Sequence, residues 1–521
     1  MPRGKVHTLA IALGLLFAVP LCAIPIQAQA PDVVAPVAAP PAAAPPAAPA
    51  TAATLAPRLD AGQLRVAESL RQLTDWVKGR GGSWSARIVD PDSGVIWAEA
   101  APQAALNPAS NMKVLTAAVA LERLGEEFCF HTGLYGKLEG DRVESLVLRG
   151  DGDPSLSLPD LWELARALRS LGVARVGQIL VDQSRFDDQF VPPAFAQQPD
   201  EWASFRAPVS AVALERNTVT LNVVPTNPGE AARAWFEPAG VVSVEGTIET
   251  RRAGAGESIQ LSLETRGEQL IARLGGHAPK SLPRLRFERR LDDPRRAPGL
   301  ALRELLIAAG IEVQGNVGLG GQQIDSRLVF HQSEPLGRLI SELGKHSDNF
   351  YAEMLFKALG AEAGAAPARS EDGARVVRDW LSSHGLASPD LRIENGSGLF
   401  DANRVSAATL AGVLVAVRRN PAVYPEFLAQ LAIGGVDGTL RSRFRKLKAE
   451  RVVRAKTGTL AAAVGLTGYV LAGSQTPIAF SLLVNGLDGQ AHAVRERMDR
   501  VVETIAEARK AHGPAPFPPA P

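Results

Sequence analysis

Cysteine and histidine are scarce in this chain, and neither forms a recognisable metal-binding pattern. The 521 residues contain two cysteines, Cys22 and Cys129, and eight histidines. No histidine stands in a His-Glu-x-x-His arrangement or at metal-ligand spacing from a cysteine, so we expect no metal and no cofactor. Cys129 lies between Phe128 and Phe130, a setting typical of a small buried hydrophobe rather than of a catalytic thiol.

An excess of charge of either sign is also lacking. The 56 basic and 55 acidic residues leave a formal net charge of +1. Nucleic-acid binding requires a concentrated excess of lysine and arginine, so the balance argues against a nucleic-acid partner. Only 11 of the basic residues are lysines, so a lysine within a motif is unusually informative. The length suggests two to four domains with cores large enough to need no disulfide.

Long hydrophobic runs are missing apart from Thr8–Leu21, which is too short to span a bilayer. The run follows two basic residues and precedes small residues, a pattern that predicts an export signal over residues 1–30. Cleavage after Ala28 and cleavage after Ala30 both fit. The bulky residue before Cys22 argues against a lipoprotein signal. We therefore expect a periplasmic or secreted protein without an integral membrane anchor and, with Cys129 alone remaining, without an intramolecular disulfide.

Low-complexity segments flank the rest of the chain. Residues 31–57 are mostly proline, alanine, valine and threonine, a composition that favours an extended polyproline linker. Residues 513–521 contain five prolines and cannot form an amphipathic helix, so we expect a disordered tail rather than a membrane-binding foot.

Between these tails the patterns of helices and strands are mixed, which predicts an α+β fold. Helical spacing predicts helices over 64–77, 112–124, 161–171, 300–309, 336–343, 350–359, 374–384, 407–417 and 495–509. Alternation predicts strands over 85–98 (with a turn at 91–94), 179–181, 219–224, 241–250, 259–265, 467–472 and 478–484, the last two adjacent and antiparallel. The strands between residues 179 and 265 indicate an inserted β-rich region.

Three short motifs occur once each and in a fixed order. They are Ser110-Asn111-Met112-Lys113, Ser347-Asp348-Asn349 and Lys456-Thr457-Gly458. Each of the first two is expected by chance about 0.6 times per chain of this composition, but Lys-Thr-Gly only about 0.04 times. The ordered trio is therefore more informative than any one motif.

The first motif stands where a helix is predicted to begin. Ser110 follows a turn-like Asn-Pro pair, so its hydroxyl lies near backbone N–H groups and a helix dipole that favour a developing anion. Lys113 is one turn further, on the same face. Apolar neighbours and a second lysine would push its amine toward the neutral form, which can act as a base. Taken alone, the same residues also fit a helix cap and a solvated lysine.

The other two motifs have similarly plain alternatives. Ser347 and Asn349 lie in a predicted loop between two helices, where Asn349 with Glu353 would also suit a helix N-terminus. Lys456 leads into a predicted strand, and Gly458 would permit a ligand to approach the backbone closely. Its alternative is an exposed strand lysine before a turn.

Together the motifs resemble those of the penicillin-recognising serine enzymes. The 237 residues from Ser110 to Ser347 are similar to the spacing in low-molecular-mass class C penicillin-binding proteins, the D-alanyl-D-alanine carboxypeptidase/endopeptidase family (peptidase family S13). Segments 150–154, 207–211, 395–399 and 436–440 match that family as well, and the resemblance covers roughly residues 60–510.

The resemblance implies an acyl-enzyme cycle on peptidoglycan stem peptides, inhibited by β-lactams. Ser110 would attack the carbonyl of the penultimate D-alanine, with Lys113 accepting its proton. Backbone N–H groups of Ser110 and Thr459 would hold the oxyanion. Ser347 would relay a proton to the departing amine. Terminal D-alanine and a peptide cross-link are both cleaved by this one mechanism.

The same resemblance implies the substrate-binding residues. Asn349 would bind the substrate amide and help to position Lys113, while Lys456 and the hydroxyls of Thr457 and Thr459 would receive the terminal carboxylate. Thr459 stands where many relatives have serine, and residues 461–463 are three small alanines, which leaves the substrate preference beside this strand open.

The implied fold is the penicillin-recognising one, a mostly antiparallel sheet flanked by helices. The catalytic domain would comprise 58–130 and 332–512. An inserted second domain would comprise 131–221 and 289–331, and a third domain, 222–288, would be nested within it.

Two other functions fit parts of the sequence. A β-lactamase or esterase would share the trio, but the Glu-x-x-x-Asn pattern of class A enzymes is missing after Ser347. A catalytically silent wall-binding adaptor would not require all seven expected site residues. A Ser-His-Asp hydrolase is disfavoured because no Gly-x-Ser-x-Gly occurs.

Overall fold

The computed structural model describes residues 59–199, 201–266, 269–472 and 475–510. The export signal expected over 1–30, the linker over 31–57 and the tail over 513–521 lie outside these residues. The mixed α+β class expected from the sequence is confirmed.

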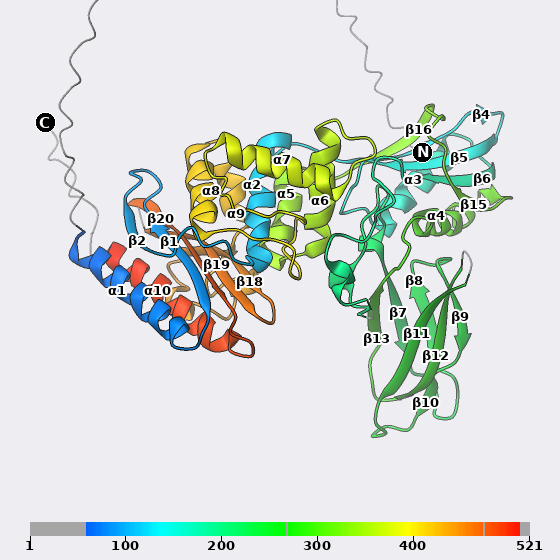
Figure 1. Ribbon diagram of the computed structural model, residues 1–521. Helices are drawn as coiled ribbons and strands as arrows, with labels where there is room; N and C mark the ends of the chain where they lie inside the picture. Colours follow the sequence, from blue (N-terminus) through cyan, green and yellow to red (C-terminus); the bar gives the residue numbers. More distant parts are fainter. Residues whose placement is uncertain (1–58, 200, 267–268, 473–474, 511–521) are drawn as a thin grey trace, which may run out of the picture. The chain divides into compact units, whose positions relative to one another are not determined.

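A six-stranded antiparallel sheet forms one part of the molecule, in the order β17-β18-β19-β20-β1-β2 (Figure 1). Its strands are β1 (Ser83–Val89), β2 (Ile96–Ala100), β17 (Ala432–Ile433), β18 (Val453–Thr459), β19 (Ala463–Ala472) and β20 (Gln475–Asn485). The strands expected over 85–98 form the hairpin of β1 and β2, with the turn where proline and glycine predicted it. The expected pairing of β19 with β20 is also confirmed.

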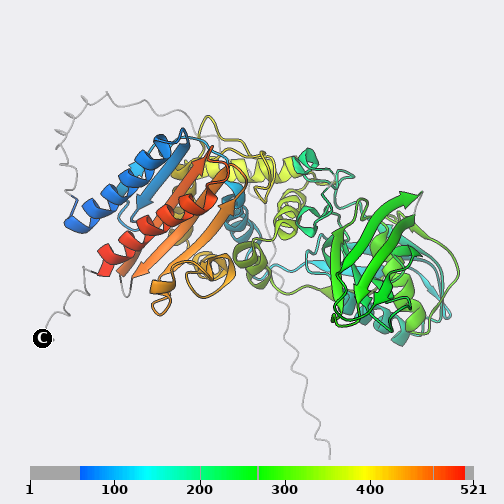
Figure 2. The same ribbon diagram turned by 90° about the horizontal axis from the view of Figure 1, so that it is seen from below.

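Two terminal helices cover one face of this sheet. Helices α1 (Ala61–Lys78) and α10 (Ala491–Lys510) lie side by side against it, as both views show (Figures 1 and 2). In α1 the buried residues Val66, Leu70, Leu73 and Val77 recur every three or four positions, which is the spacing that predicted the helix. Their core is shared with the inner face of the sheet.

A second core is built mainly from helices. Its helices are α2 (Met112–Leu124), α5 (Leu336–Ser341), α6 (Asn349–Glu362), α7 (Ser370–Ser383), α8 (Ala407–Arg419) and α9 (Tyr424–Gln430). Every residue from Met112 to Leu121 is buried, so α2 is the central helix. The helix expected over 336–343 ends earlier, because α5 continues as a π-helical turn, Glu342–His346. That turn leads into the second motif.

The region between the first and second motifs is rich in β-structure, as expected. A seven-stranded sheet contains β3 (His131–Tyr135), β4 (Leu138–Glu139), β5 (Arg142–Gly150), β6 (Arg175–Asp182), β14 (Glu312–Val313), β15 (Val317–Leu319) and β16 (Arg327–Gln332). Helices α3 (Leu158–Ser170) and α4 (Ala297–Ala308) accompany it.

Two smaller sheets complete this region. One consists of β7 (Thr218–Val224), β8 (Arg233–Glu237) and β13 (Leu285–Arg290), and the other of β9 (Val242–Gly246), β10 (Glu249–Arg251), β11 (Ser258–Arg266) and β12 (Gln269–Pro279). The single strand expected over 241–250 is two strands, β9 and β10, each paired in parallel with β12. One buried apolar cluster runs through the whole region.

The expected domain boundaries remain predictions. Those at 221/222 and 288/289 each fall inside a strand, β7 and β13, and these two strands pair with each other. The boundary at 331/332 falls at the end of β16, whose partner is β3.

Candidate active site

Ser110 lies in a short 3₁₀ turn, Ala109–Asn111, that leads directly into α2. The hydroxyl is therefore at the N-terminal end of the central helix, as the sequence predicted. The Nζ of Lys113, one turn further, lies 3.2 Å from Ser110 Oγ. The spacing of the first motif thus places a hydroxyl and an amine in direct contact.

Lys113 is buried, with 1% of its surface exposed. Its Nζ also contacts Asn349 Oδ1 at 2.7 Å and the Ser397 carbonyl at 2.8 Å. Burial lowers the pKa of Lys113 to about 7, while the carboxylates of Glu353 and Asp348 oppose the shift. The neutral amine is therefore well populated near neutral pH. The sequence attributed this effect to burial and a second lysine, and burial is the cause that the structure supports.

The second motif combines a left-handed residue with a helix cap. Ser347 follows the π-helical turn with φ near 60°, and Asp348 caps α6 by accepting a hydrogen bond from the Tyr351 amide at 3.0 Å. Because Asp348 is the cap, the Asn349 side chain is free of that role. Asn349 instead contacts Lys113, and its Nδ2 donates to the Phe205 carbonyl at 3.0 Å.

The third motif lies on β18. The Nζ of Lys456 donates to Ser347 Oγ at 2.8 Å and to the Thr457 carbonyl at 2.7 Å. Lys456 is 1% exposed, and burial, with repulsion from Lys113, holds the pKa of its amine well below the usual value. The three motifs therefore meet through two contacts, Lys113 to Asn349 and Lys456 to Ser347.

The structure explains the glycine at position 458 in a different way from the sequence analysis. A Cβ at this position would lie 2.6 Å from Asn111 Nδ2 and 2.8 Å from the Pro108 carbonyl oxygen. The sequence suggested that this glycine admits a ligand. The structure shows that the turn carrying Ser110 packs directly against Gly458. A side chain at this position would therefore clash with that turn.

A cavity of about 850 Å³ opens beside these contacts. Four of the expected residues line it, namely Ser110, Ser347, Thr457 and Thr459. Lys113 and Lys456 are buried and do not line the cavity. Its other lining residues come from the segment 439–446 and from α10.

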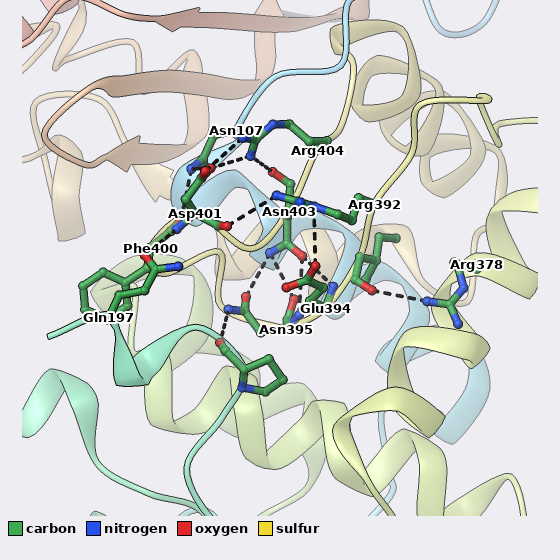
Figure 3. Close-up of polar contacts among 12 residues, drawn as sticks. Asn107, Gln197, Arg378, Arg392, Glu394, Asn395, Phe400, Asp401, Asn403 and Arg404 are labelled. Carbon is green, nitrogen blue, oxygen red and sulfur yellow. Dashed lines mark hydrogen bonds and ion pairs between the residues drawn. The ribbon is translucent and has the colours of Figure 1, made fainter. Parts of the chain in front are cut away.

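A second hollow of about 760 Å³ meets the first at Thr459 and is lined partly by the loop that follows Ser397. Figure 3 shows how that loop is held. Asn107 Nδ2 donates to the Phe400 carbonyl and to Asp401, Arg404 pairs with Asp401, and the Asn403 amide donates to Asn395 Oδ1 at 2.9 Å. The loop is therefore ordered by its own polar contacts.

Glu353 is a site residue that the sequence did not reveal. It lies one turn after Asn349 in α6, is 1% exposed, and accepts hydrogen bonds from the backbone N–H groups of Gly396 at 3.1 Å and Ser397 at 2.8 Å. The Ser397 carbonyl contacts Lys113, so by binding the Ser397 N–H group Glu353 helps to fix the position of that carbonyl. Burial raises the pKa of this carboxyl. The only sequence signals were the match over 395–399 and a glutamate one turn into a helix.

Replacing Glu353 by leucine is expected to destabilise the protein and slow its chemistry. The change leaves two buried N–H groups without acceptors, at a cost of about 1–3 kcal/mol each, and releases the carbonyl that holds Lys113. Glu353→Gln keeps one acceptor oxygen and serves as the matched control, with a smaller loss expected. Thermal unfolding midpoints and acylation rates of both variants test this. Wild-type values for Glu353→Leu would contradict it.

The inserted region also reaches the site. Phe205 holds Asn349, and Arg216 forms an ion pair with Asp348 at 3.3 Å. Behind them, Lys357 in α6 is fully buried and pairs with Asp187. The segment from 187 to 216 therefore contacts α6 both at its N-terminus, where the second motif ends, and further along the helix at Lys357.

Comparison with known proteins identifies the family. The model of the D-Ala-D-Ala carboxypeptidase 3 (S13) family matches residues 70–508. The chain is 32% identical over 406 residues to a D-alanyl-D-alanine carboxypeptidase of Actinomadura sp. (strain R39), covering 74% of each protein. The chain belongs to the S13 family. The resemblance found in the sequence is thereby confirmed, and the protein is a serine-type D-Ala-D-Ala carboxypeptidase of that family.

Other S13 relatives agree with this assignment. The D-alanyl-D-alanine carboxypeptidase DacB of Haemophilus influenzae is 27% identical over 387 residues, covering 73% of this chain and 80% of that protein. The crystal structure of penicillin binding protein 4 (dacB) from the same organism superposes with a TM-score of 0.70 at 23% identity, over 83% of this chain and 99% of that one. The penicillin-recognising fold is therefore confirmed.

Within 59–510, apart from the gaps given above, no helix is both long and apolar enough to span a bilayer. Within the same residues, no three histidine, cysteine or carboxylate side chains gather in a way that would hold a metal ion.

Proposed function

We propose that this S13 enzyme cleaves peptidoglycan stem peptides after the penultimate D-alanine through an acyl-enzyme on Ser110. The observation that carries the proposal is the 3.2 Å contact between Ser110 Oγ and a buried lysine amine whose pKa is about 7. A serine hydroxyl is a weak nucleophile until a base removes its proton. The position of Lys113 and the pKa of its amine suit it to be that base.

Acylation then uses the remaining motif residues. As Ser110 attacks the carbonyl, its proton passes to Lys113, and the backbone N–H groups of Ser110 and Thr459 stabilise the oxyanion. Ser347 accepts a hydrogen bond from Lys456, which leaves its own hydroxyl proton to be donated to the departing D-alanine amine. Water releases the shortened peptide in the second half of the cycle.

Substrate binding follows from the same wall of the cavity. Asn349 is assigned the substrate amide and the positioning of Lys113, which it already contacts. Thr457 and Thr459 line the cavity and are assigned the terminal carboxylate. Lys456 was expected to receive that carboxylate directly. Lys456 does not line the cavity, and its amine is hydrogen-bonded to Ser347 Oγ and the Thr457 carbonyl. We therefore assign it the role of positioning Ser347 and Thr457.

The wider setting is part of the proposal. Stem peptides and β-lactams are the proposed partners, and export by the N-terminal signal would place the enzyme in the periplasm or outside the cell, where peptidoglycan is found. The inserted region is proposed to comprise a second domain (131–221 and 289–331) and a nested third (222–288). One known contribution of the insert is the bracing of α6 by residues 187–216.

The test is to trap the acyl-enzyme. Protein lacking residues 1–30 is incubated with a fluorescent penicillin, and the adduct is located by peptide mass spectrometry. A long-lived adduct on Ser110, together with D-alanine release from a stem pentapeptide, is the expected result. Rapid hydrolysis of the drug would favour a β-lactamase instead. Folded protein that shows neither adduct nor turnover would overturn the proposal and favour a wall-binding adaptor.

The pH dependence of acylation should report Lys113. With a pKa of about 7, the amine is neutral above this pH and becomes protonated below it. The second-order rate constant for penicillin acylation is therefore expected to fall about tenfold per pH unit below 7 and to level off above it. Stopped-flow measurements from about pH 5 to pH 9, with circular dichroism to verify folding, test this. A flat profile across that range would contradict a base of this pKa.

A further inference from the structure

A substrate that ends in a carboxylate requires a permanent positive charge at the cavity wall. Neither motif lysine presents one. Lys113 contacts Ser110, and Lys456 is 1% exposed, with its amine bound to Ser347 Oγ and the Thr457 carbonyl. Burial and the neighbouring lysine also disfavour the charged form of Lys456. Thr457 and Thr459 line the cavity, but their hydroxyls carry no charge.

Arg495 supplies the missing charge. It lies in the second turn of α10, is partly buried, and lines the same cavity as Ser110, Ser347, Thr457 and Thr459. A guanidinium stays protonated at any pH at which the enzyme works, and its planar fork matches a carboxylate. Unlike a lysine, it therefore keeps its charge when partly desolvated.

The contact of Arg495 with Thr459 orients both groups. Its Nη2 donates to Thr459 Oγ1 at 3.0 Å. Because that bond uses a lone pair of the hydroxyl, the hydroxyl proton must point elsewhere and can be donated to a bound anion. Arginine and threonine together thus offer two adjacent donors to an anion bound beside Thr459.

The other basic residues of the cavity are less suitable. Arg443 is held by Asp499 through contacts of 2.5 and 3.0 Å, so its charge is already matched. Arg445 and Lys446 are exposed. Glu496 and Glu503 line the cavity too, and each disfavours an anion placed beside it. Among the residues that the structure describes, Arg495 is the one cation with a side-chain hydrogen bond to the hydroxyl of Thr457 or Thr459.

We propose that Arg495 is a specificity-determining residue that, with the hydroxyls of Thr457 and Thr459, binds the C-terminal carboxylate of the substrate. The inference rests on the proposed function and deepens it. The charge that selects a peptide ending in a free carboxylate comes from the last helix of the chain, and Lys456 acts on the carboxylate only through Ser347 and Thr457.

The experiment compares two peptides that differ in one group. A short acylated peptide ending in D-Ala-D-Ala is paired with the same peptide as its C-terminal carboxamide, and kcat/KM is measured for each. The variants are Arg495→Ala and Arg495→Lys. Arg500→Ala, which removes an exposed arginine from the same helix without touching the cavity, is the matched control.

Arg495→Ala is expected to lose about 10- to 100-fold on the carboxylate peptide, the value of one charge-assisted contact, and less than about threefold on the carboxamide. Arg495→Lys should retain part of the preference, and Arg500→Ala all of it. An unchanged ratio of the two peptides in Arg495→Ala overturns the inference. If Arg495→Ala does not fold, a ratio in Arg495→Lys equal to that of wild type, with unchanged kcat/KM, overturns it.

The proposed function fails in a different way. Wild-type protein that cleaves neither peptide and forms no penicillin adduct would refute the proposed function, and the inference with it. Wild-type protein that cleaves both peptides equally would leave acyl-enzyme chemistry intact and refute the carboxylate site alone.

Discussion

Ser110→Ala is expected to abolish the covalent adduct with penicillin and to lower D-alanine release by a factor on the order of 10⁶, as loss of a nucleophile does in other serine enzymes. The hydroxyl is the group of this residue that contacts the Lys113 amine, so its removal takes away the proposed nucleophile and leaves the proposed base in place. The substitution removes one oxygen from a half-buried position at the start of α2 and should leave the fold intact.

The measurement is fluorescence of the denatured protein after incubation with labelled penicillin, with D-alanine release followed in parallel. Ser383→Ala, which alters an exposed serine of α7 outside the site, is the control and should label like wild type. An adduct that persists in Ser110→Ala would mean that another residue is the nucleophile. Unfolding of the variant would be evident in its thermal midpoint.

Lys113→Met is expected to slow acylation by about 10²- to 10⁴-fold, the usual contribution of a positioned general base. Methionine has a similar length and suits a buried site, so the cavity is not enlarged. The nucleophile remains, and a slow adduct on Ser110 should still form. The dependence of the rate on pH near 7 should disappear with the amine that causes it.

Two results separate this role from a structural one. Lys78→Met, which alters an exposed lysine at the end of α1, should keep both the rate and the pH profile of wild type. Lys113→Met protein that retains the inflection near pH 7 would show that another group is the base. The measurement is the stopped-flow acylation rate as a function of pH.

Most of the helices were predictable from local patterns, whereas strands such as β5 and β12 were not predicted. The buried positions of α1 and the apolar length of α2 follow from the spacing of their residues, and the hairpin of β1 and β2 from its turn residues. Predictions failed where packing overrode the pattern. The strand expected over 241–250 is divided because β9 and β10 each pair with β12, and α5 ends in a π-helical turn that positions Ser347.

The candidate site was predictable only in part. Of the seven residues expected from the motifs, four line one cavity and the other three are linked to them by hydrogen bonds, Asn349 through Lys113. These positions were predictable because each motif consists of residues that are close together in the sequence. Glu353 and Arg495 were not predictable, because neither belongs to a motif. Each acts through a contact that depends on how distant segments pack: Glu353 with a loop more than 40 residues away, and Arg495 with a strand 36 residues earlier.

By itself, the sequence determined the α+β pattern, the order of the three motifs, the serine and lysine pair at i and i+3, and the family. These features depend on the spacing of residues that are close together in the sequence, so they can be recognised without a structure. The tertiary structure alone decided the rest. Burial lowers the pKa of Lys113, contact with the Ser110 turn requires Gly458, residues 187–216 of the insert brace α6, and α10 brings Arg495 to Thr459. Burial and long-range contact arise only when separate segments pack together, so no local pattern encodes them.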